Sequence, residues 1–240
     1  AMEDKRGYKG EIDHVQADLT EKKGIVAIAE KVASMCNDGA MCLRLLVHNA
    51  GVNTPCKHMM DMGREEWRFV NSVNVEAPLF LTKALLPYFG KDTTTRNRVL
   101  FLSSQVRNCK IEAYGPYSIT KLSSFGVAKM LALELPKRDT PVYCSTLIPG
   151  EVDTKMQKET AFGNNDQFPA KLVKHWQRMQ KSGQLLPPEV SGAFMEYVLC
   201  DTEPSEYSSN DWMIYDKSHH TKWTQKFPDV EIVEPKGLFD

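Results

Sequence analysis

The sequence predicts an α/β fold in which helices cover both faces of a parallel sheet. Short apolar runs alternate along the chain with longer segments of helical periodicity, and the short runs show little apolar–polar alternation. A strand with one solvated face alternates in polarity, whereas a strand covered on both faces is apolar throughout. A length of 240 residues suits a single domain of this class, which we assign to residues 1–217.

The first four expected strands each end in a recognisable turn. The first ends at an acidic turn, the second at Asn49, the third at a pair of serines and the fourth at Pro149. The predicted strands are 14–18, 43–47, 99–102, 142–148 and 212–215, and the predicted helices are 25–32, 67–89 and 117–135. Ligands of such sheets bind beyond the carboxyl ends of the strands. The turns after the strands should therefore share one edge of the sheet.

Two segments depart from this alternation. The chain between Glu151 and Pro188 is longer and more polar, with an amphipathic helix expected around 171–178, and it forms either a substrate lid or a plain surface excursion. Residues 218–240 show no clear periodicity, so we predict an arm or tail in which His219 and His220 are solvated.

Composition limits the partners. The chain has 30 Lys and Arg residues against 31 Asp and Glu, so it lacks the basic excess typical of nucleic-acid binding, and we expect no nucleic-acid partner. We expect a cytoplasmic protein with no membrane partner, because no apolar run approaches the roughly 18 residues that span a bilayer. The six cysteines and six histidines show no zinc-binding spacing, so we predict no metal site.

The residues most suited to chemistry are Tyr117 and Lys121. They lie four positions apart on a predicted helix, so both side chains leave the same face. A free tyrosine has a pKa of about 10, and a nearby ammonium group favours the phenolate and lowers that value. The pair could act as an acid and base at neutral pH, with Ser104 bonding the oxygen of a reacting carbonyl. The same spacing also occurs in exposed helical pairs without function.

Several motifs occur together in one order, and jointly they resemble the short-chain dehydrogenase/reductase family from about His14 to Asp216. The residues that carry this resemblance are Asp18-Leu19, Asn49-Ala50-Gly51, Asn74, Ser104, Tyr117, Lys121, Pro149-Gly150 and Thr154. The resemblance implies a doubly wound Rossmann-type sheet and an oxidoreductase that uses a nicotinamide cofactor.

The resemblance also implies a role for each matching residue. Tyr117 would donate the proton as hydride arrives, Lys121 would lower its pKa and hold the nicotinamide ribose, and Ser104 would orient the substrate carbonyl. Asn74 would kink its helix and hold a water of the proton relay. The implied cofactor contacts are Asp18 and Leu19 at the adenine, Asn49, Ala50 and Gly51 beneath the adenosine half, Tyr117 and Lys121 themselves, and Pro149, Gly150, Val152 and Thr154 at the nicotinamide.

Three segments are similar to the sepiapterin reductase and benzil reductase branch of this family. They are 152–157, 180–186 and 214–217, and the branch reduces vicinal dicarbonyl groups with NADPH. We therefore expect NADPH rather than NAD as cofactor and a small carbonyl compound as substrate. Where sepiapterin reductases anchor the pterin with an aspartate, this chain has Met213 with Asp211 close by. A pterin side chain and a small diketone are thus both candidate substrates.

The glycine-rich loop that holds the pyrophosphate in this family does not occur in the printed sequence. Only Gly7 and Gly10 precede Asp18, so the first strand–helix–strand unit is missing, and we expect a sheet split between 14–18 and 43–47 with unpaired edges. Either the printed sequence omits a segment, or the chain is a truncated, non-catalytic interaction module. A further alternative is an epimerase or dehydratase that keeps NAD bound.

Three other expectations concern surfaces and side chains. The helices 67–89 and 117–135 resemble those through which family members form a homodimer or homotetramer, although their apolar faces could simply cover the sheet. Phe168, Trp176 and Met179 either line an apolar substrate pocket or belong to the core. Asp216 either faces the substrate or, as we prefer, caps the end of the last strand.

Overall fold

The computed structural model describes residues 11–37, 39–91, 96–163, 167–228 and 232. Within them, one four-stranded sheet has the order β1-β2-β3-β4. Its strands are β1 (Leu45–His48), β2 (Arg98–Leu102), β3 (Tyr143–Ile148) and β4 (Asp211–Met213). All neighbouring strands are parallel. The predicted α/β fold with a parallel sheet is confirmed, and so are the expected strands from 43–47 onward.

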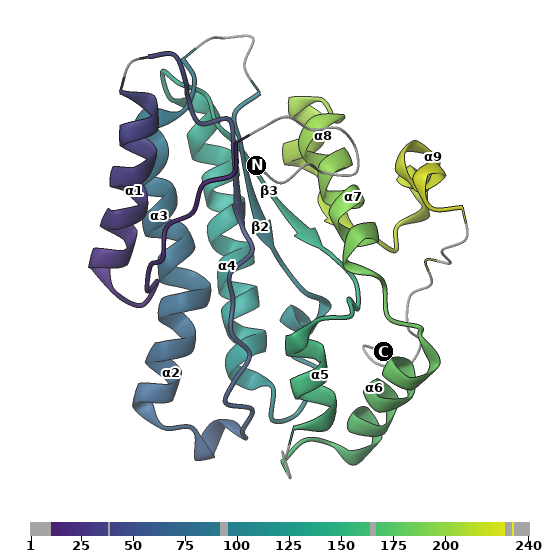
Figure 1. Ribbon diagram of the computed structural model, residues 1–240. Helices are drawn as coiled ribbons and strands as arrows, with labels where there is room; N and C mark the ends of the chain where they lie inside the picture. Colours follow the sequence, from purple (N-terminus) through teal and green to yellow (C-terminus); the bar gives the residue numbers. More distant parts are fainter. Residues whose placement is uncertain (1–10, 38, 92–95, 164–166, 229–231, 233–240) are drawn as a thin grey trace.

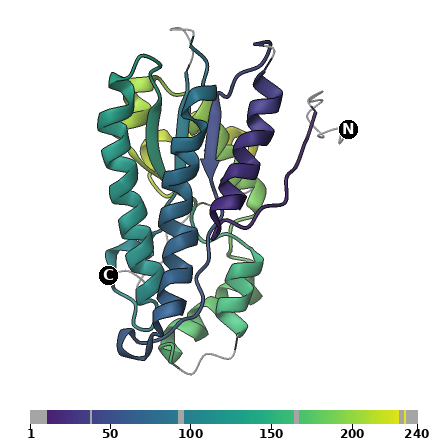
Figure 2. The same ribbon diagram turned by 90° about the vertical axis from the view of Figure 1, so that its left-hand side faces the viewer.

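Helices cover both faces of this sheet. They are α1 (Lys22–Cys36), α2 (Arg64–Asn71), α3 (Ala77–Leu85), α4 (Gly115–Glu134), α5 (Lys155–Phe162), α6 (Ala170–Ser182), α7 (Pro188–Cys200), α8 (Pro204–Ser209) and α9 (His220–Trp223). Figure 2 shows α1, α3 and α4 side by side over one face, and α7 to α9 lie on the other (Figure 1). Helices α5 and α6 lie beyond the carboxyl ends of the strands. None of the described helices is both long and apolar enough to span a membrane.

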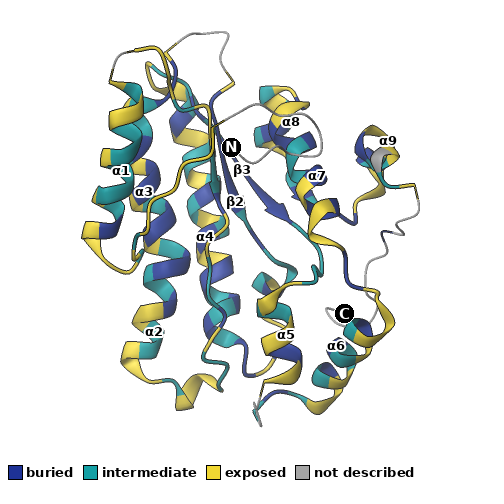
Figure 3. Cartoon of the chain, viewed as in Figure 1, coloured by how far each residue is buried: buried dark blue, intermediate teal, exposed yellow. Residues whose placement is uncertain are grey.

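Strand β2 shows why the strands lack alternation. Val99 and Phe101 pack into one buried cluster with Ala128 of α4, whereas Leu100 packs into another with Phe194 of α7. Successive side chains of a strand point to opposite faces, so a sheet covered on both sides favours apolar residues on both faces of its strands. Figure 3 shows β2 and β3 buried between the two helical layers.

The predicted helix 67–89 is interrupted at its centre. A π-helical turn at Ser72–Glu76 separates α2 from α3, and a 3-10 turn at Leu86–Tyr88 ends the segment. The predicted helix 117–135 is confirmed as α4, which begins two residues earlier with Pro116 in its first turn, a position that proline favours because the missing N–H is unpaired there anyway. Helix α7 was not predicted.

The predicted strand 14–18 is wrong. Residues 11–18 form no regular secondary structure, and Ile12 and Val15 are 70% and 40% exposed. A strand is stable only when a neighbour completes its hydrogen bonds. Within the described residues β1 pairs with β2 alone, and its Leu45 is 39% exposed. The predicted split sheet is therefore also wrong: the observed sheet is continuous and begins at β1.

The described part of the predicted tail is folded rather than an arm. Lys217–His219 and Thr224–Lys226 form 3-10 turns on either side of α9. Trp223 belongs to the buried cluster beneath α7, and the His219 ring stacks on Phe194 at a centroid distance of 5.1 Å. The expected solvation of His219 is wrong because this aromatic contact buries it. Residues 229–231 and 233–240 of the predicted tail lie outside the described residues, and the boundary at residue 217 stays a prediction.

Candidate active site

A cleft of about 540 Å³ opens at the carboxyl edge of the sheet. The turns after β1, β2 and β3 form its floor, α4 forms one wall, and α5, α6 and α7 contribute the rest. Most of the predicted site residues line it, namely Asn49, Ala50, Gly51, Ser104, Tyr117, Lys121, Pro149, Gly150, Val152 and Thr154. The turns after β1, β2 and β3 therefore share one edge of the sheet as expected, because parallel strands bring their carboxyl ends together, whereas the turn at Asp18 follows no strand and does not line the cleft.

Ser104, Tyr117 and Lys121 meet inside this cleft. Ser104 caps the 3-10 turn Gln105–Asn108, and its side chain forms a hydrogen bond with that of Tyr117. The Nζ atom of Lys121 lies 5.6 Å from the centroid of the Tyr117 ring. Neighbouring Ser103 accepts a hydrogen bond from Arg107 instead. The serine expected from its spacing is thus the one that contacts the tyrosine.

The protonation of the pair differs from the expectation. Burial raises the pKa of Tyr117 to about 12, although the hydrogen bond from Ser104 opposes this shift. Burial also lowers the pKa of Lys121 to about 8. Lys121 does not lower the pKa of Tyr117 here, because its ammonium group donates to the carbonyl of Leu102 at 2.7 Å. Tyr117 consequently carries its proton at neutral pH and can donate it.

Asn74 lies behind the cleft rather than in its lining. It sits within the π-helical turn, as the expected kink requires, and its amide exchanges two hydrogen bonds of 2.8 Å with the main chain of Val52. It also donates to Thr120 of α4 at 2.9 Å. A side chain on Gly51 would lie 3.3 Å from the Asn74 Oδ1 atom. These contacts give Asn74 a positioning role, and its part in a proton relay stays a prediction.

The turn after β3 has a conformation that requires glycine. Gly150 has a φ angle of +86°, and a Cβ atom there would lie 2.7 Å from Leu186 and 2.8 Å from Ile214. Two residues of this segment also form hydrogen bonds with the helices that follow it. The carbonyl of Pro149 accepts from Ser191, and the hydroxyl of Thr154 caps α5 by accepting from the Gln157 amide at 3.2 Å.

Asp18 and Leu19 do not line the cleft. The carboxylate of Asp18 accepts from both the amide and the hydroxyl of Thr20, at 2.9 and 2.7 Å. These bonds lower the pKa of Asp18 and fix the turn that leads into α1. The carboxylate of Asp18 thus stabilises this turn, and its predicted contact with adenine stays a prediction.

Glu151 lines the cleft but was not predicted. Burial raises the pKa of its carboxyl group to about 7, while a hydrogen bond with Trp176 opposes the shift. Its Oε2 atom is buried and has no hydrogen-bond partner. The position directly after Pro149 and Gly150 at the edge of the sheet was the signal that could have identified it. Glu151 lines the cleft together with the two residues before it.

The remaining side chains divide between core and cleft. Phe168 and Trp176 pack edge to face at 5.6 Å in a buried cluster beneath α5 and α6, and of these two only Trp176 also lines the cleft. Met179 is buried away from it. Asp216 caps the 3-10 turn after β4 by accepting from the Ser218 amide at 2.9 Å, and it does not face the cleft.

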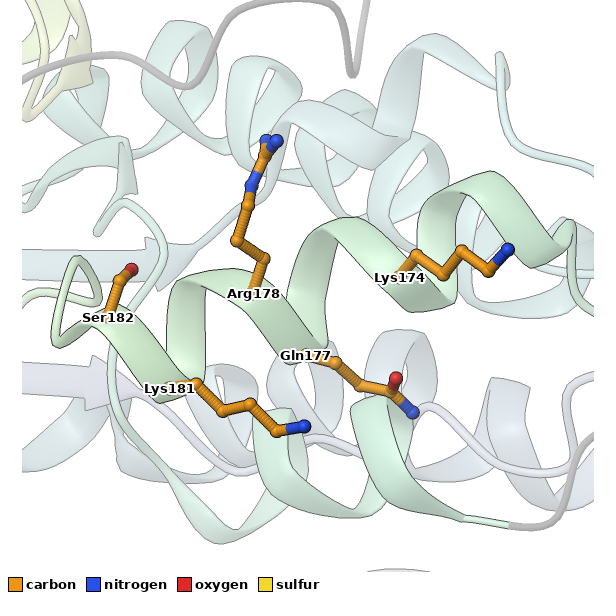
Figure 4. Close-up of a pocket in the computed structure, with 5 residues that line it drawn as sticks. All are labelled: Lys174, Gln177, Arg178, Lys181 and Ser182. Carbon is orange, nitrogen blue, oxygen red and sulfur yellow. The ribbon is translucent and has the colours of Figure 1, made fainter.

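A second hollow, of about 410 Å³, lies on the outer side of α6. Its lining residues are Lys174, Gln177, Arg178, Lys181 and Ser182. Figure 4 shows that Arg178 points away from the two lysines, so the cations do not converge on one ligand position. The described residues also contain no group of three or more His, Cys, Asp or Glu side chains able to hold a metal ion. All six cysteines are free thiols.

Comparison with known proteins adds to this geometry. The profile of the family described as short chain dehydrogenase matches residues 1–164. The human protein "Dehydrogenase/reductase SDR family member 2, mitochondrial" is 32% identical over 139 residues, which make up 58% of this chain and 47% of that protein. The chain therefore spans about half the length of this curated relative.

Solved structures resemble the fold. The short chain dehydrogenase/reductase YIR035C from Saccharomyces cerevisiae is 23% identical, with a TM-score of 0.74 over 87% of this chain and 78% of that one. A short chain dehydrogenase from Burkholderia cenocepacia, determined in complex with NADP, is 20% identical, with a TM-score of 0.60 over 83% of this chain and 72% of that one. At these identities the likeness concerns the fold alone.

Proposed function

Since this chain belongs to the short chain dehydrogenase family, we propose that it reduces a small carbonyl compound to an alcohol with NADPH. The substrate class that we propose is a vicinal dicarbonyl or a sepiapterin-like side chain. The observation that carries the proposal is the convergence of Ser104, Tyr117 and Lys121 in one cleft at the carboxyl edge of the sheet. The similarity of residues 152–157, 180–186 and 214–217 to the sepiapterin and benzil reductase branch supports this substrate class.

The cleft suits the nicotinamide half of the cofactor. Because Gly51 has no side chain, space remains in front of Asn74 and Lys121. At Gly150 the surrounding side chains leave no room for a Cβ atom. Val152 and Thr154 would hold the nicotinamide from the other side, and Lys121 would hold its ribose. When bound, the nicotinamide supplies the hydride, and the protein supplies position and the proton.

The protein's own residues would then act on the substrate oxygen. The hydroxyl of Ser104 would donate a hydrogen bond to the carbonyl oxygen and place its carbon for attack. As the carbon gains hydride, the oxygen gains negative charge, and Tyr117 would release the proton of its Oη atom to that oxygen. Trp176 and the buried wall beneath α6 would exclude water during the step.

The test of this function is the substitution Tyr117→Phe. We expect it to lower kcat for the reduction of benzil at least 100-fold, because it removes the proton donor and leaves the ring in place. Tyr143→Phe, at the start of β3 and outside the cleft, is the matched control and should keep wild-type turnover. Turnover within a few-fold of wild type for a folded Tyr117→Phe would refute the proposed mechanism.

Cofactor choice is tested by calorimetric titration of the protein with NADPH and, in parallel, with NADH. We propose tighter binding of NADPH, with micromolar affinity. The alternative function is a non-catalytic interaction module with the same fold, and it is favoured by one observation: Asp18 and Leu19 lie outside the cleft lining. Binding of neither nucleotide would support that alternative. Bound NAD that is not consumed would indicate an epimerase or dehydratase.

We also propose that the chain assembles as a homodimer or homotetramer through α3 and α4. These helices lie side by side on one face of the molecule (Figure 2). Apolar side chains on them are about half exposed, namely Phe80 on α3 and Leu122, Met130 and Leu133 on α4. Light scattering would show a mass of two or four chains, and Leu133→Glu should shift it toward one.

A further inference from the structure

We propose that Glu151 and Gln157 form a polar subsite that selects carbonyl substrates with a hydroxyl group beside the carbonyl, an inference that rests on the proposed function. Both side chains line the cleft that contains Tyr117. Glu151 follows the turn after β3, and Gln157 lies in the first turns of α5. The subsite is therefore part of the wall that faces the substrate.

The backbone around Glu151 is held from two sides. Its amide donates to the Tyr215 hydroxyl at 2.8 Å, and its carbonyl accepts from the Leu186 amide at 2.8 Å. The amide of Asp153 donates to the carbonyl of Leu186 at 2.9 Å, and together these bonds form a short parallel bridge between Val152 and Leu186. A side chain on a backbone fixed in this way has few positions available, as a selective contact requires.

The side chain of Glu151 points toward α6. Its carboxyl group forms a hydrogen bond with Trp176 of α6. The residues proposed for the cofactor at Asn49 and Gly51 come from the opposite side, after β1. Glu151 lies between Gly150 and Val152, which we assign to the nicotinamide, and its carboxyl group bonds to α6, so the subsite would border the position of the reacting carbonyl.

Each of the two side chains has one buried atom without a partner. These atoms are Oε2 of Glu151, an acceptor, and Nε2 of Gln157, a donor. A buried polar atom that makes no hydrogen bond costs about 1–3 kcal/mol. A ligand that bonds to both would remove this cost. The unpaired acceptor and donor therefore indicate a ligand group that both donates and accepts a hydrogen bond.

A single hydroxyl group placed between these two atoms would satisfy both. Its hydrogen can be donated to Glu151, and its oxygen can accept from Gln157. An ammonium group could bond to Glu151 but has no lone pair for Gln157, and a plain ketone has no donor for Glu151. The same wall also carries the apolar side chains of Met156, Trp176 and Met195, which suit a hydrocarbon body. The structure thus favours α-hydroxy ketones over unsubstituted ketones.

The test compares benzoin with deoxybenzoin, which differ only in the hydroxyl group. With NADPH and wild-type protein, we expect kcat/KM to be at least tenfold higher for benzoin, because a site built to bond a hydroxyl rejects the analogue that lacks it. Glu151→Leu should bring this ratio close to one by lowering kcat/KM for benzoin. Asp153→Asn is the matched control, since that carboxylate belongs to the same segment but pairs with Lys158 outside the cleft.

Binding is measured separately by calorimetry, so that the two proposals can fail independently. Binding of benzoin at least tenfold tighter than deoxybenzoin, lost in Glu151→Leu, supports the subsite even if no ketone is reduced, in which case the proposed function fails. Equal kcat/KM values for the two ketones in the wild type overturn the subsite and leave the proposed function intact. A protein that neither binds nor reduces them contradicts both. The wild-type comparison stands even if Glu151→Leu fails to fold.

Discussion

The ammonium group of Lys121 donates a hydrogen bond of 2.7 Å to the carbonyl oxygen of Leu102, the last residue of β2. This bond ties the helix that carries Tyr117 to the strand that leads into Ser104. The proton donor and the residue that orients the carbonyl are therefore held together by a third member of the same site. Lys121 is buried at this position, and its lowered pKa follows from that burial.

We expect the burial of Lys121 to show in the pH dependence of stability. Its pKa is about 8 in the folded protein and about 10.5 unfolded, so the unfolded chain binds more protons between these values. Stability from this group therefore rises with pH from about 8 to 10.5, by at most about 3 kcal/mol. Denaturant unfolding of wild type and Lys121→Met should diverge in that window. Lys155→Met, whose side chain is 89% exposed, should parallel the wild type.

Glu151 is expected to give the opposite dependence. Its pKa is raised from 4.5 to about 7, so the folded protein binds more protons than the unfolded chain between these values. The stability of the wild type falls there as pH rises, relative to a variant without the group. Glu151→Gln should be more stable than wild type at pH 8, by about 1–3 kcal/mol, and equal to it near pH 4. An equal difference at both pH values would contradict the burial of this carboxyl group.

Gly150→Ala is expected to destabilise the turn after β3. The positive φ angle strains any other residue, and the added methyl group would collide with Leu186 and Ile214. We expect a loss of about 1–3 kcal/mol in the free energy of unfolding and weaker nucleotide binding. Gly126→Ala on α4 is the control: its Cβ meets nothing within 4 Å, and the substitution should stabilise the helix slightly. Thermal unfolding of both variants decides the prediction.

Arg98→Met is expected to destabilise the whole fold. Arg98 is fully buried, and its guanidinium donates to the carbonyls of Val198 and Leu199 at 2.8 Å, at the C-terminal end of α7. Methionine fills a similar volume but leaves these carbonyls unpaired and removes a cation from the negative end of the helix dipole. A loss of about 3–5 kcal/mol should follow.

The control for Arg98 is Arg96→Met. Arg96 pairs with Glu203 at the surface, where its side chain is 43% exposed, so its loss should cost less than about 1 kcal/mol. Equal effects of the two substitutions in urea unfolding would show that the buried contacts contribute little.

Apolar runs and helical spacing in the sequence were enough to predict the buried strands and the helices that cover them. The strands at 99–102 and 142–148 lie where the apolar runs placed them, because a strand covered on both faces must be apolar throughout. The spacing of Tyr117 and Lys121 was also sufficient, since a helix brings residues four apart to one face. Even the interruption of the helix at Asn74 was expected from the family resemblance.

The sequence by itself therefore determined the layered α/β fold and the identity of most residues in the candidate active site. Only the tertiary structure decided the rest. Residues 14–18 were expected to form a strand but have no strand beside them in the described chain. Trp223 is buried only because α7 provides a surface for it. Lys121 bonds to a strand end rather than to its tyrosine, and Glu151 faces the cleft because Tyr215 and Leu186 hold its backbone. These outcomes depend on partners distant in sequence, which local periodicity does not contain.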